Sequence, residues 1–190
     1  YPMVKGLPDF PEVVPVIKYP SEQFNFGGLW HADTTYLEEP PMAGLLLARE
    51  VPPVGGDTLF ANMYKAYQEL DNDLKQKLAN CTANHGYYSA TVQRGEHQGA
   101  FSGEFAHPVF IEHNETGRTV LYISRLLTLR IPELSKKESD LVLDKLFDHS
   151  ERREFIYEHV WKVGDLVMWD NRCINHARTD FPRTERRLLR

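Results

Sequence analysis

Short apolar segments separated by prolines and glycines constrain the fold of this chain most strongly. Helical spacing of apolar residues is confined to 63–78 and 135–150, and no strand–helix–strand alternation recurs. The pattern predicts a mainly β domain with flanking helices, built either as an antiparallel double sheet or as a jelly-roll barrel, which is also called a double-stranded β-helix. The candidate strands are 13–18, 43–50, 59–61, 107–112, 120–123, 154–160, 165–169, 173–177 and 186–189.

Composition excludes several classes of protein. The 190 residues suit one domain with a real core, and 42% hydrophobic residues indicate a globular chain. A formal charge of -5 with mixed signs disfavours a general nucleic-acid or anionic-membrane surface. No apolar run approaches the ~20 residues that cross a bilayer. Because only two unpaired cysteines occur, we expect neither a disulfide framework nor a zinc-thiolate site, and a cytoplasmic location.

The ends of the chain carry two further signals. The sequence begins without Met, so we expect it to be an excerpt of a longer chain. A basic cluster near the other end is predicted to be a solvated face or an interaction tail. Its members are Arg178, Arg183, Arg186, Arg187 and Arg190.

One short motif offers metal ligands. His31 and Asp33 are two residues apart, so in an extended segment both side chains lie on the same face. They would supply two ligands of a 2-His-1-carboxylate iron site if another histidine came from elsewhere, and His176 is a candidate. Alone, the pair is a frequent chance occurrence, so its surroundings decide how it is interpreted.

Several motifs occur together and in order along nearly the whole chain. They resemble the taurine dioxygenase (TauD/TfdA-like) family of Fe(II)- and 2-oxoglutarate-dependent oxygenases. The resemblance implies a jelly-roll, cupin-like core. It also implies that residues 1–190 form a single catalytic domain that lacks N-terminal and extreme C-terminal segments of the full family fold. The motifs are Trp30-His31-x-Asp33, Gly55-Gly56-Asp57-Thr58-Leu59, His107-Pro108-Val109, Glu115-Thr116-Gly117 and Trp169-Asp170-Asn171-Arg172.

The resemblance also assigns roles to individual residues. It makes His31, Asp33 and His176 the catalytic iron ligands, leaving coordination sites for the keto-acid head of 2-oxoglutarate and for O2. Thr58 and Arg187 would hold the distal carboxylate of that cosubstrate. Taken alone, Thr58 would be a turn residue and Arg187 part of a surface ion pair. The implied reaction is hydroxylation with release of succinate and CO2, and the retained Asp33 favours it over halogenation.

The substrate is less well defined. Tyr1 matches a substrate-contacting tyrosine of taurine-type members, and His107 is a candidate for the edge of the pocket. Taurine-type enzymes carry Asn where this chain has Gly27 and Phe where it has Leu127, and both departures argue against taurine. We therefore expect a small, anionic substrate such as a sulfonate, a sulfate ester or an aryloxy acid.

Two regions have no assigned chemistry. The stretch 85–105 is predicted to be a long loop, and its portion 87–104 resembles the lid of the family. The remaining histidines are predicted to be surface or packing residues. They are His85, His97, His113, His149 and His159.

Two other functions stay open at this point. A non-catalytic jelly roll could bind a small acid or a protein partner. A zinc-dependent hydrolase could use the same ligands, although Thr58 and Arg187 would then have no role. For the oxygenase, the expected partners are a small-molecule substrate and O2, with no nucleic acid and no membrane. Homo-oligomers are common in the family, and the number of subunits stays open.

Overall fold

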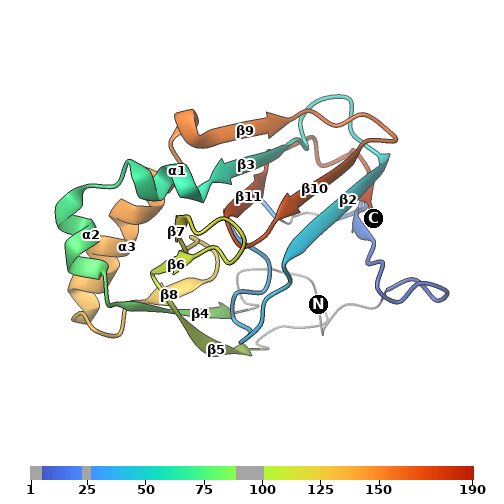
Figure 1. Ribbon diagram of the computed structural model, residues 1–190. Helices are drawn as coiled ribbons and strands as arrows, with labels where there is room; N and C mark the ends of the chain where they lie inside the picture. The colour runs from blue at the N-terminus through green and yellow to red at the C-terminus, as the bar shows by residue number, and fades with distance from the viewer. Residues whose placement is uncertain (1–5, 23–26, 89–100) are drawn as a thin grey trace.

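Two antiparallel sheets form the centre of the molecule, which is a computed structural model that describes residues 6–22, 27–88 and 101–190. Aromatic side chains join the sheets, because Trp169 of one sheet lies 5.5 Å from Phe60 of the other between ring centroids. This confirms the predicted mainly β, jelly-roll architecture (Figure 1). The first sheet has the order β1 (Val16–Lys18), β12 (Arg187–Leu189), β2 (Ala43–Glu50) and β10 (Leu166–Asp170), and the second β11 (Ile174–Arg178), β3 (Thr58–Asn62) and β9 (Ile156–His159).

A third sheet, a hairpin and the helices flank this centre. The helices gather at one end of the molecule in Figure 1. None of the helices in the described part of the chain combines the length and apolarity that a bilayer span requires. The third sheet has the order β5 (Phe101–Pro108), β4 (Thr82–Tyr88) and β8 (Thr128–Arg130); the hairpin is β6 (Phe110–Glu112) and β7 (Thr119–Leu121); the helices are α1 (Met63–Gln68), α2 (Asn72–Leu78), α3 (Lys136–Ser150) and the short η2 (Arg153–Phe155).

The largest apolar core lies between the helices and the hairpin. Helix α3 is the predicted second helix, and it begins after Ser135, whose side chain accepts a hydrogen bond from the Glu138 backbone N–H. Leu146 and Phe147 are among the α3 residues that pack into this core, together with Leu121 of β7. The helices therefore cover the barrel at the end away from β1 and β12, as Figure 1 shows.

The predicted single helix over 63–78 is wrong, because the chain forms α1 and α2 instead. The Asn62 side chain accepts a hydrogen bond from the Lys65 backbone N–H and caps α1. Asp71 does the same for α2 by accepting from the Asp73 backbone N–H at 2.8 Å. An aspartate that bonds to nearby backbone favours a helix start over a helix interior, so the helical pattern is interrupted there.

The predicted long loop over 85–105 is also partly wrong. Strands β4 and β5 pair through this region, with His85 opposite Phe105 and Asn84 opposite Ala106. Strand pairing prevails here over the lack of clear periodicity in a stretch with much Gly, Ser, Gln and charge. His107 consequently lies near the end of β5, not at the start of a strand. The predicted lid falls largely on 89–100, outside the described residues.

Gly44 allows Trp169 to lie between the two central sheets. The two residues are partners in the pairing of β2 with β10. A Cβ atom on Gly44 would come within 2.3 Å of the Trp169 ring, and that ring packs against His176 at 4.8 Å between centroids. The absence of a side chain at Gly44 therefore sets the position of an aromatic wall beside His176.

We expect Gly44→Ala to destabilise the fold by about 1–3 kcal/mol, the usual range for overpacking a filled core. Urea unfolding of the variant and the wild type measures this difference. Gly28→Ala is the matched control, because a Cβ there would meet only the carbonyl oxygen of Arg178 at 3.9 Å. Equal stability of the two glycine variants would contradict this account of Gly44.

Candidate metal centre

An isolated β-bridge brings together two histidines from distant parts of the chain. The His31 backbone N–H donates to the His176 carbonyl at 3.0 Å, and the His176 N–H donates to the His31 carbonyl at 2.7 Å. Residues that exchange both hydrogen bonds across antiparallel strands present their side chains on the same face. The two imidazole rings consequently lie 4.2 Å apart between centroids.

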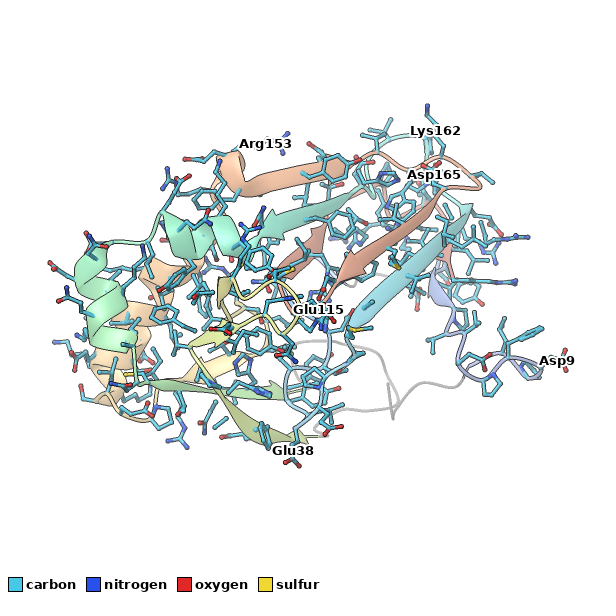
Figure 2. The ribbon with its side chains drawn as sticks, viewed as in Figure 1. Asp9, Glu38, Glu115, Arg153, Lys162 and Asp165 are labelled. Carbon is cyan, nitrogen blue, oxygen red and sulfur yellow. The ribbon has the colours of Figure 1, made fainter. Side chains whose placement is uncertain are left out.

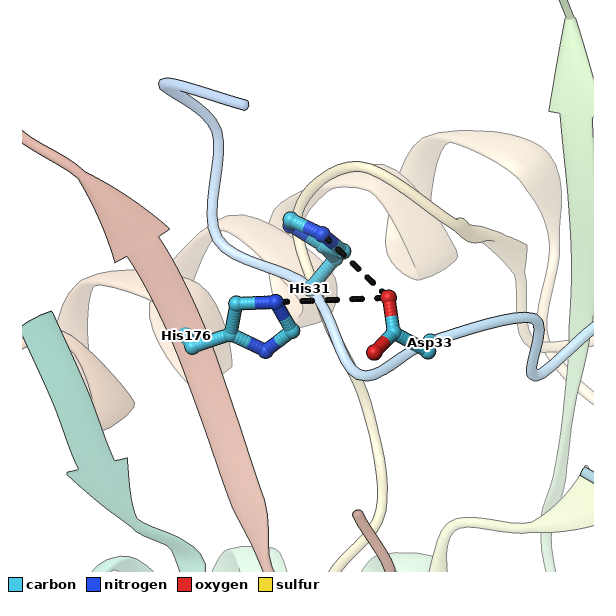
Figure 3. Close-up of side chains that lie close together, drawn as sticks. All are labelled: His31, Asp33 and His176. Carbon is cyan, nitrogen blue, oxygen red and sulfur yellow. Dashed lines mark ion pairs between the residues drawn. The ribbon is translucent and has the colours of Figure 1, made fainter. Parts of the chain in front are cut away.

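Asp33 completes the cluster (Figure 3). Its Oδ1 atom lies 3.7 Å from His31 Nε2 and 4.0 Å from His176 Nε2. These separations are too long for hydrogen bonds. They suit ligands of one shared ion, because two atoms each roughly 2.1 Å from a metal lie at most about 4.2 Å apart. Two imidazole nitrogens and one carboxylate oxygen are also a donor set that fits a non-haem iron.

The ring nitrogens of both histidines fit this use. His31 Nδ1 lies 2.8 Å from the Leu29 carbonyl oxygen and donates to it, so Nε2 is the nitrogen that faces Asp33. Burial, followed by the neighbouring His31, lowers the pKa of His176 to about 3, while Asp33 opposes the shift. His176 is therefore neutral at pH 7, which is the form that binds a metal ion.

The chain turns sharply immediately after Ala32, so the extended segment expected around His31 and Asp33 ends there. Thr34 has φ +51° and is the one non-glycine residue with positive φ in the described ranges. A β-branched residue in this conformation is strained, and such strain concentrates at functional sites. Thr34 is buried, and its hydroxyl has no hydrogen-bond partner among the described residues. Sequence reasoning gave no signal for this residue.

A hollow that is open to solvent has Arg187 and two further cationic side chains in its lining. Arg187 is only 5% exposed, so the surface ion pair considered for it is wrong. Its Nε donates to the Gly56 carbonyl at 3.0 Å. Burial, and then repulsion by Arg178, lowers the pKa of Arg187 to about 10, which leaves it charged at pH 7. The hollow is lined by Val16, Ile17, Lys18, Arg178, Phe181 and Arg187.

Strand register links this cationic hollow to the histidine cluster. On β11 and β3, His176 is opposite Phe60 and Arg178 is opposite Thr58. Side chains two residues apart share a face, so Arg178 lies on the face of His176, one step further along the strand. Thr58 is beside it, and its hydroxyl accepts a hydrogen bond from Trp161 Nε1 at 2.9 Å. One side of the barrel thus carries the two histidines and the carboxylate, followed further along the strand by cationic side chains.

Arg178 is a residue whose role the sequence analysis missed. It was placed in a solvated basic cluster, but it is buried at 9% exposure and lines the hollow. Side chains alternate between the two faces of a strand, so the spacing of two residues from His176 could have identified Arg178.

Two of the predicted substrate residues belong to segments that are hydrogen-bonded to the site. Gly27 has φ +85°, and its carbonyl accepts from the Arg178 backbone N–H at 2.8 Å. Leu127 is buried, and the preceding residue donates to the Trp30 carbonyl, next to His31. Both residues therefore belong to segments that contact the site. Tyr1 lies outside the described residues.

The remaining predicted substrate residue, His107, is half-buried on the third sheet, next to the buried His85. His107 Nε2 lies 3.0 Å from the Leu37 carbonyl oxygen, and its ring lies 5.5 Å from that of His85. His85 Nδ1 lies 2.9 Å from the Thr35 hydroxyl, so this group adjoins the turn after Asp33. Burial, followed by His107, lowers the pKa of His85 to about 3. His85 is a packing residue, as expected.

This buried histidine makes stability depend on pH. Below the unfolded pKa of about 6.5, unfolded His85 binds a proton that the folded form excludes until about pH 3. The free energy of unfolding therefore falls as the pH drops through this window. When the pH is lowered from 7 to 5, we expect the free energy of unfolding to fall by ~2 kcal/mol less in His85→Leu than in the wild type. Urea titrations at both pH values measure the difference, and equal losses in the two proteins would contradict the burial argument.

A second cluster has metal-ligand residue types but a different arrangement. Ligand atoms of His113, Asp170 and Cys173 lie within 4.8 Å of one another. The Asp170 carboxylate already accepts hydrogen bonds from Arg172, at 2.9 Å from Nε and 2.6 Å from Nη2. Arg172 also pairs with Glu115, in the turn of the β6–β7 hairpin (Figure 2). Since burial raises the pKa of the Cys173 thiol, this cluster joins structural elements and does not present free anionic ligands.

A jelly roll that brings two histidines and a carboxylate together, with a buried arginine in the same barrel, fits the cupin-like class of fold that the resemblance implied. Within that class, the chain belongs to the TauD/TfdA family, as the resemblance implied. Residues 5–190 match the family model described as "Taurine catabolism dioxygenase TauD, TfdA family".

Individual relatives agree with this family. The chain is 36% identical over 171 residues to (S)-phenoxypropionate/alpha-ketoglutarate-dioxygenase of Sphingobium herbicidovorans. The matched region covers 84% of this chain and 59% of the relative. A taurine dioxygenase from Burkholderia xenovorans superposes with TM-score 0.78 and 29% identity, covering 96% and 64% of the two chains. AAD-2 in complex with Mn(II) and N-oxalylglycine superposes with TM-score 0.77 and 32% identity, covering 86% and 62%. The chain thus spans about three fifths of the length of these relatives.

Proposed function

We propose that this chain is the catalytic domain of an Fe(II)- and 2-oxoglutarate-dependent dioxygenase that hydroxylates a small, anionic organic substrate. The observation that carries the proposal is the convergence of His31, Asp33 and His176 on one point, with a hollow lined by cationic side chains on the same side of the barrel. Family membership supports it, because the relatives are named as alpha-ketoglutarate-dependent dioxygenases, and alpha-ketoglutarate is 2-oxoglutarate.

The three side chains would hold the metal ion, and the ion would supply the oxidative chemistry. His31 Nε2, His176 Nε2 and an Asp33 oxygen would bind one Fe(II) on a single face and leave the opposite face open. Bound Fe(II) would couple the oxidative decarboxylation of 2-oxoglutarate by O2, which yields succinate and CO2, to insertion of the second oxygen atom into a substrate C–H bond. Trp169 and Phe60 pack beside His176 and exclude water from this side of the site.

The cationic hollow suits the distal carboxylate of 2-oxoglutarate. Arg187 keeps its guanidinium in a buried site, where a planar fork can hold a carboxylate through two parallel hydrogen bonds. The Thr58 hydroxyl, which already accepts from Trp161, can donate its own proton to the same carboxylate. Arg178 and Lys18 also line the hollow, and an anion bound there would relieve the repulsion between Arg178 and Arg187.

The substrate class follows from charge and from the relatives. One relative is named for (S)-phenoxypropionate and one structural neighbour for taurine, which are both small molecules with one strongly acidic group. Gly27 and Leu127 stand where the resemblance places larger taurine-contacting residues. We therefore propose an aryloxy acid, sulfate ester or sulfonate other than taurine. The same proposal includes O2 as the second cosubstrate and action in the cytoplasm. Homo-oligomers are a state compatible with it.

Anaerobic loading with Fe(II) and 2-oxoglutarate, followed by O2 and a panel of small anions, tests the proposal. We expect one substrate to give succinate and hydroxylated product in equal amounts. Binding of small acids without O2 consumption across the panel would favour a non-catalytic binding protein. Product formation that persists without O2 would favour hydrolysis at a zinc ion.

A further inference from the structure

We propose that Asn171 is a positioning residue that fixes the metal-binding carboxylate of Asp33. The inference rests on the proposed function, because it concerns the same metal centre. Asn171 lies in the turn between β10 and β11, so the strand that carries His176 begins three residues after it. Its side-chain hydrogen bonds go to the backbone of Asp33 and Pro41 and not to the two histidine ligands, so it would act through Asp33.

The Asn171 side chain holds both backbone polar groups of Asp33. The Asp33 N–H donates to Asn171 Oδ1 at 2.7 Å, and Asn171 Nδ2 donates to the Asp33 carbonyl at 3.0 Å. The same Nδ2 donates to the Pro41 carbonyl at 3.1 Å, and the Asn171 backbone N–H donates to the Met42 carbonyl at 2.9 Å. With an exposed fraction of 1%, Asn171 makes these bonds away from water. One buried amide thus fixes the peptide groups on both sides of the Asp33 side chain.

Asp33 needs such a restraint because it lies in a turn. The bridge to His176 holds the backbone of His31, but the following residues from Asp33 onward form a turn. Thr34, next to Asp33, has the strained φ of +51°. A strained conformation persists only where the surroundings over-determine it. The paired bonds from Asn171 supply that restraint immediately beside the strained residue.

The turn between β10 and β11, which carries Asn171, is itself anchored to the β6–β7 hairpin. Asp170 Oδ1 accepts from the Arg172 backbone N–H at 2.9 Å, and Asp170 Oδ2 lies 3.0 Å from His113 Nε2. Arg172 bonds in turn to Glu115 of the hairpin turn. These contacts hold the residues on either side of Asn171, so its amide points to Asp33 from a rigid base. Asp33 and His176 are then both positioned by one turn.

Co(II) titration of the metal-free 190-residue chain, followed by visible absorption, tests this role without turnover. We expect Asn171→Ala to weaken Co(II) binding roughly 10- to 100-fold, as loss of an outer-shell partner does, and to change the Co(II) spectrum. Asn175→Ala is the matched control. It also removes a buried amide, but the Asn175 Nδ2 donates to the Ile123 carbonyl at 2.7 Å and not to Asp33. We expect this control to keep the wild-type affinity and spectrum at a comparable loss of thermal stability.

Asn171→Ser is a second variant with a smaller polar side chain, for use if the alanine variant fails to fold. Wild-type affinity and spectrum in either folded Asn171 variant would overturn the inference. Loss of the folded state in both variants would also overturn it, because Asn171 would then serve fold stability alone. A wild-type chain that binds no Co(II) would instead contradict the metal centre of the proposed function, so the two failures are distinguishable.

Discussion

The His176→Ala variant is expected to lose metal binding and all substrate-dependent succinate release. Its imidazole is buried, neutral at pH 7 and one of only two nitrogen donors in the cluster with Asp33. Removing a direct ligand should weaken metal affinity by more than the roughly 10- to 100-fold that loss of an outer-shell partner produces. Co(II) titration and a succinate assay on the same preparation measure the two effects.

His149→Ala is the matched control for this variant. His149 is also a partly buried histidine, but its Nε2 lies 2.8 Å from the Ala66 carbonyl oxygen at the helical end of the molecule. We expect the control to bind Co(II) as the wild type does. A His176→Ala protein that keeps wild-type metal affinity and succinate release would remove the basis of the proposed function.

The second large effect is expected at Arg187. Replacement by Leu should raise the KM for 2-oxoglutarate roughly 10- to 100-fold, because a hydrogen bond to a charged group contributes about 1.5–3 kcal/mol. Arg187→Lys should fall between Leu and the wild type, since it keeps the charge but loses the planar fork. Initial rates of succinate release over a 2-oxoglutarate series measure both values.

The neighbouring Arg186 provides a control with the same chemistry. Its guanidinium pairs with Glu50 and is 39% exposed, in contrast to buried Arg187. We expect Arg186→Leu to leave the KM for 2-oxoglutarate unchanged. Equal KM values for Arg187→Leu and the wild type would show that the hollow beside Thr58 does not bind the cosubstrate.

The general fold could be predicted because apolar spacing and turn residues act locally. Where the prediction was wrong, a specific interaction prevailed over the local pattern. Asp71 caps a new helix within an otherwise helical repeat, and pairing with β5 makes a strand of β4 although the stretch lacks clear periodicity. The first of these carries a sequence signal in its aspartate, whereas the second depends on pairing with the next strand.

The site was predictable to a lesser extent. His31 and Asp33 are visible as a local motif, and the family resemblance supplied His176 and Arg187. The residues that hold the ligands in place were not predictable in this way. Asn171 resembles an ordinary turn residue, and its role depends on hydrogen bonds to Asp33 that only the folded chain forms. Arg178 could have been recognised from the alternation of side chains after His176.

A crystal structure of the protein soaked with Mn(II) and N-oxalylglycine, the pair present in the AAD-2 structure, tests the central claim most directly. We predict one ion bound by His31 Nε2, His176 Nε2 and Asp33, with the distal carboxylate of the analogue on Arg187. An ion bound instead by His113, Asp170 and Cys173, or an analogue that leaves Arg187 without contact, would contradict it.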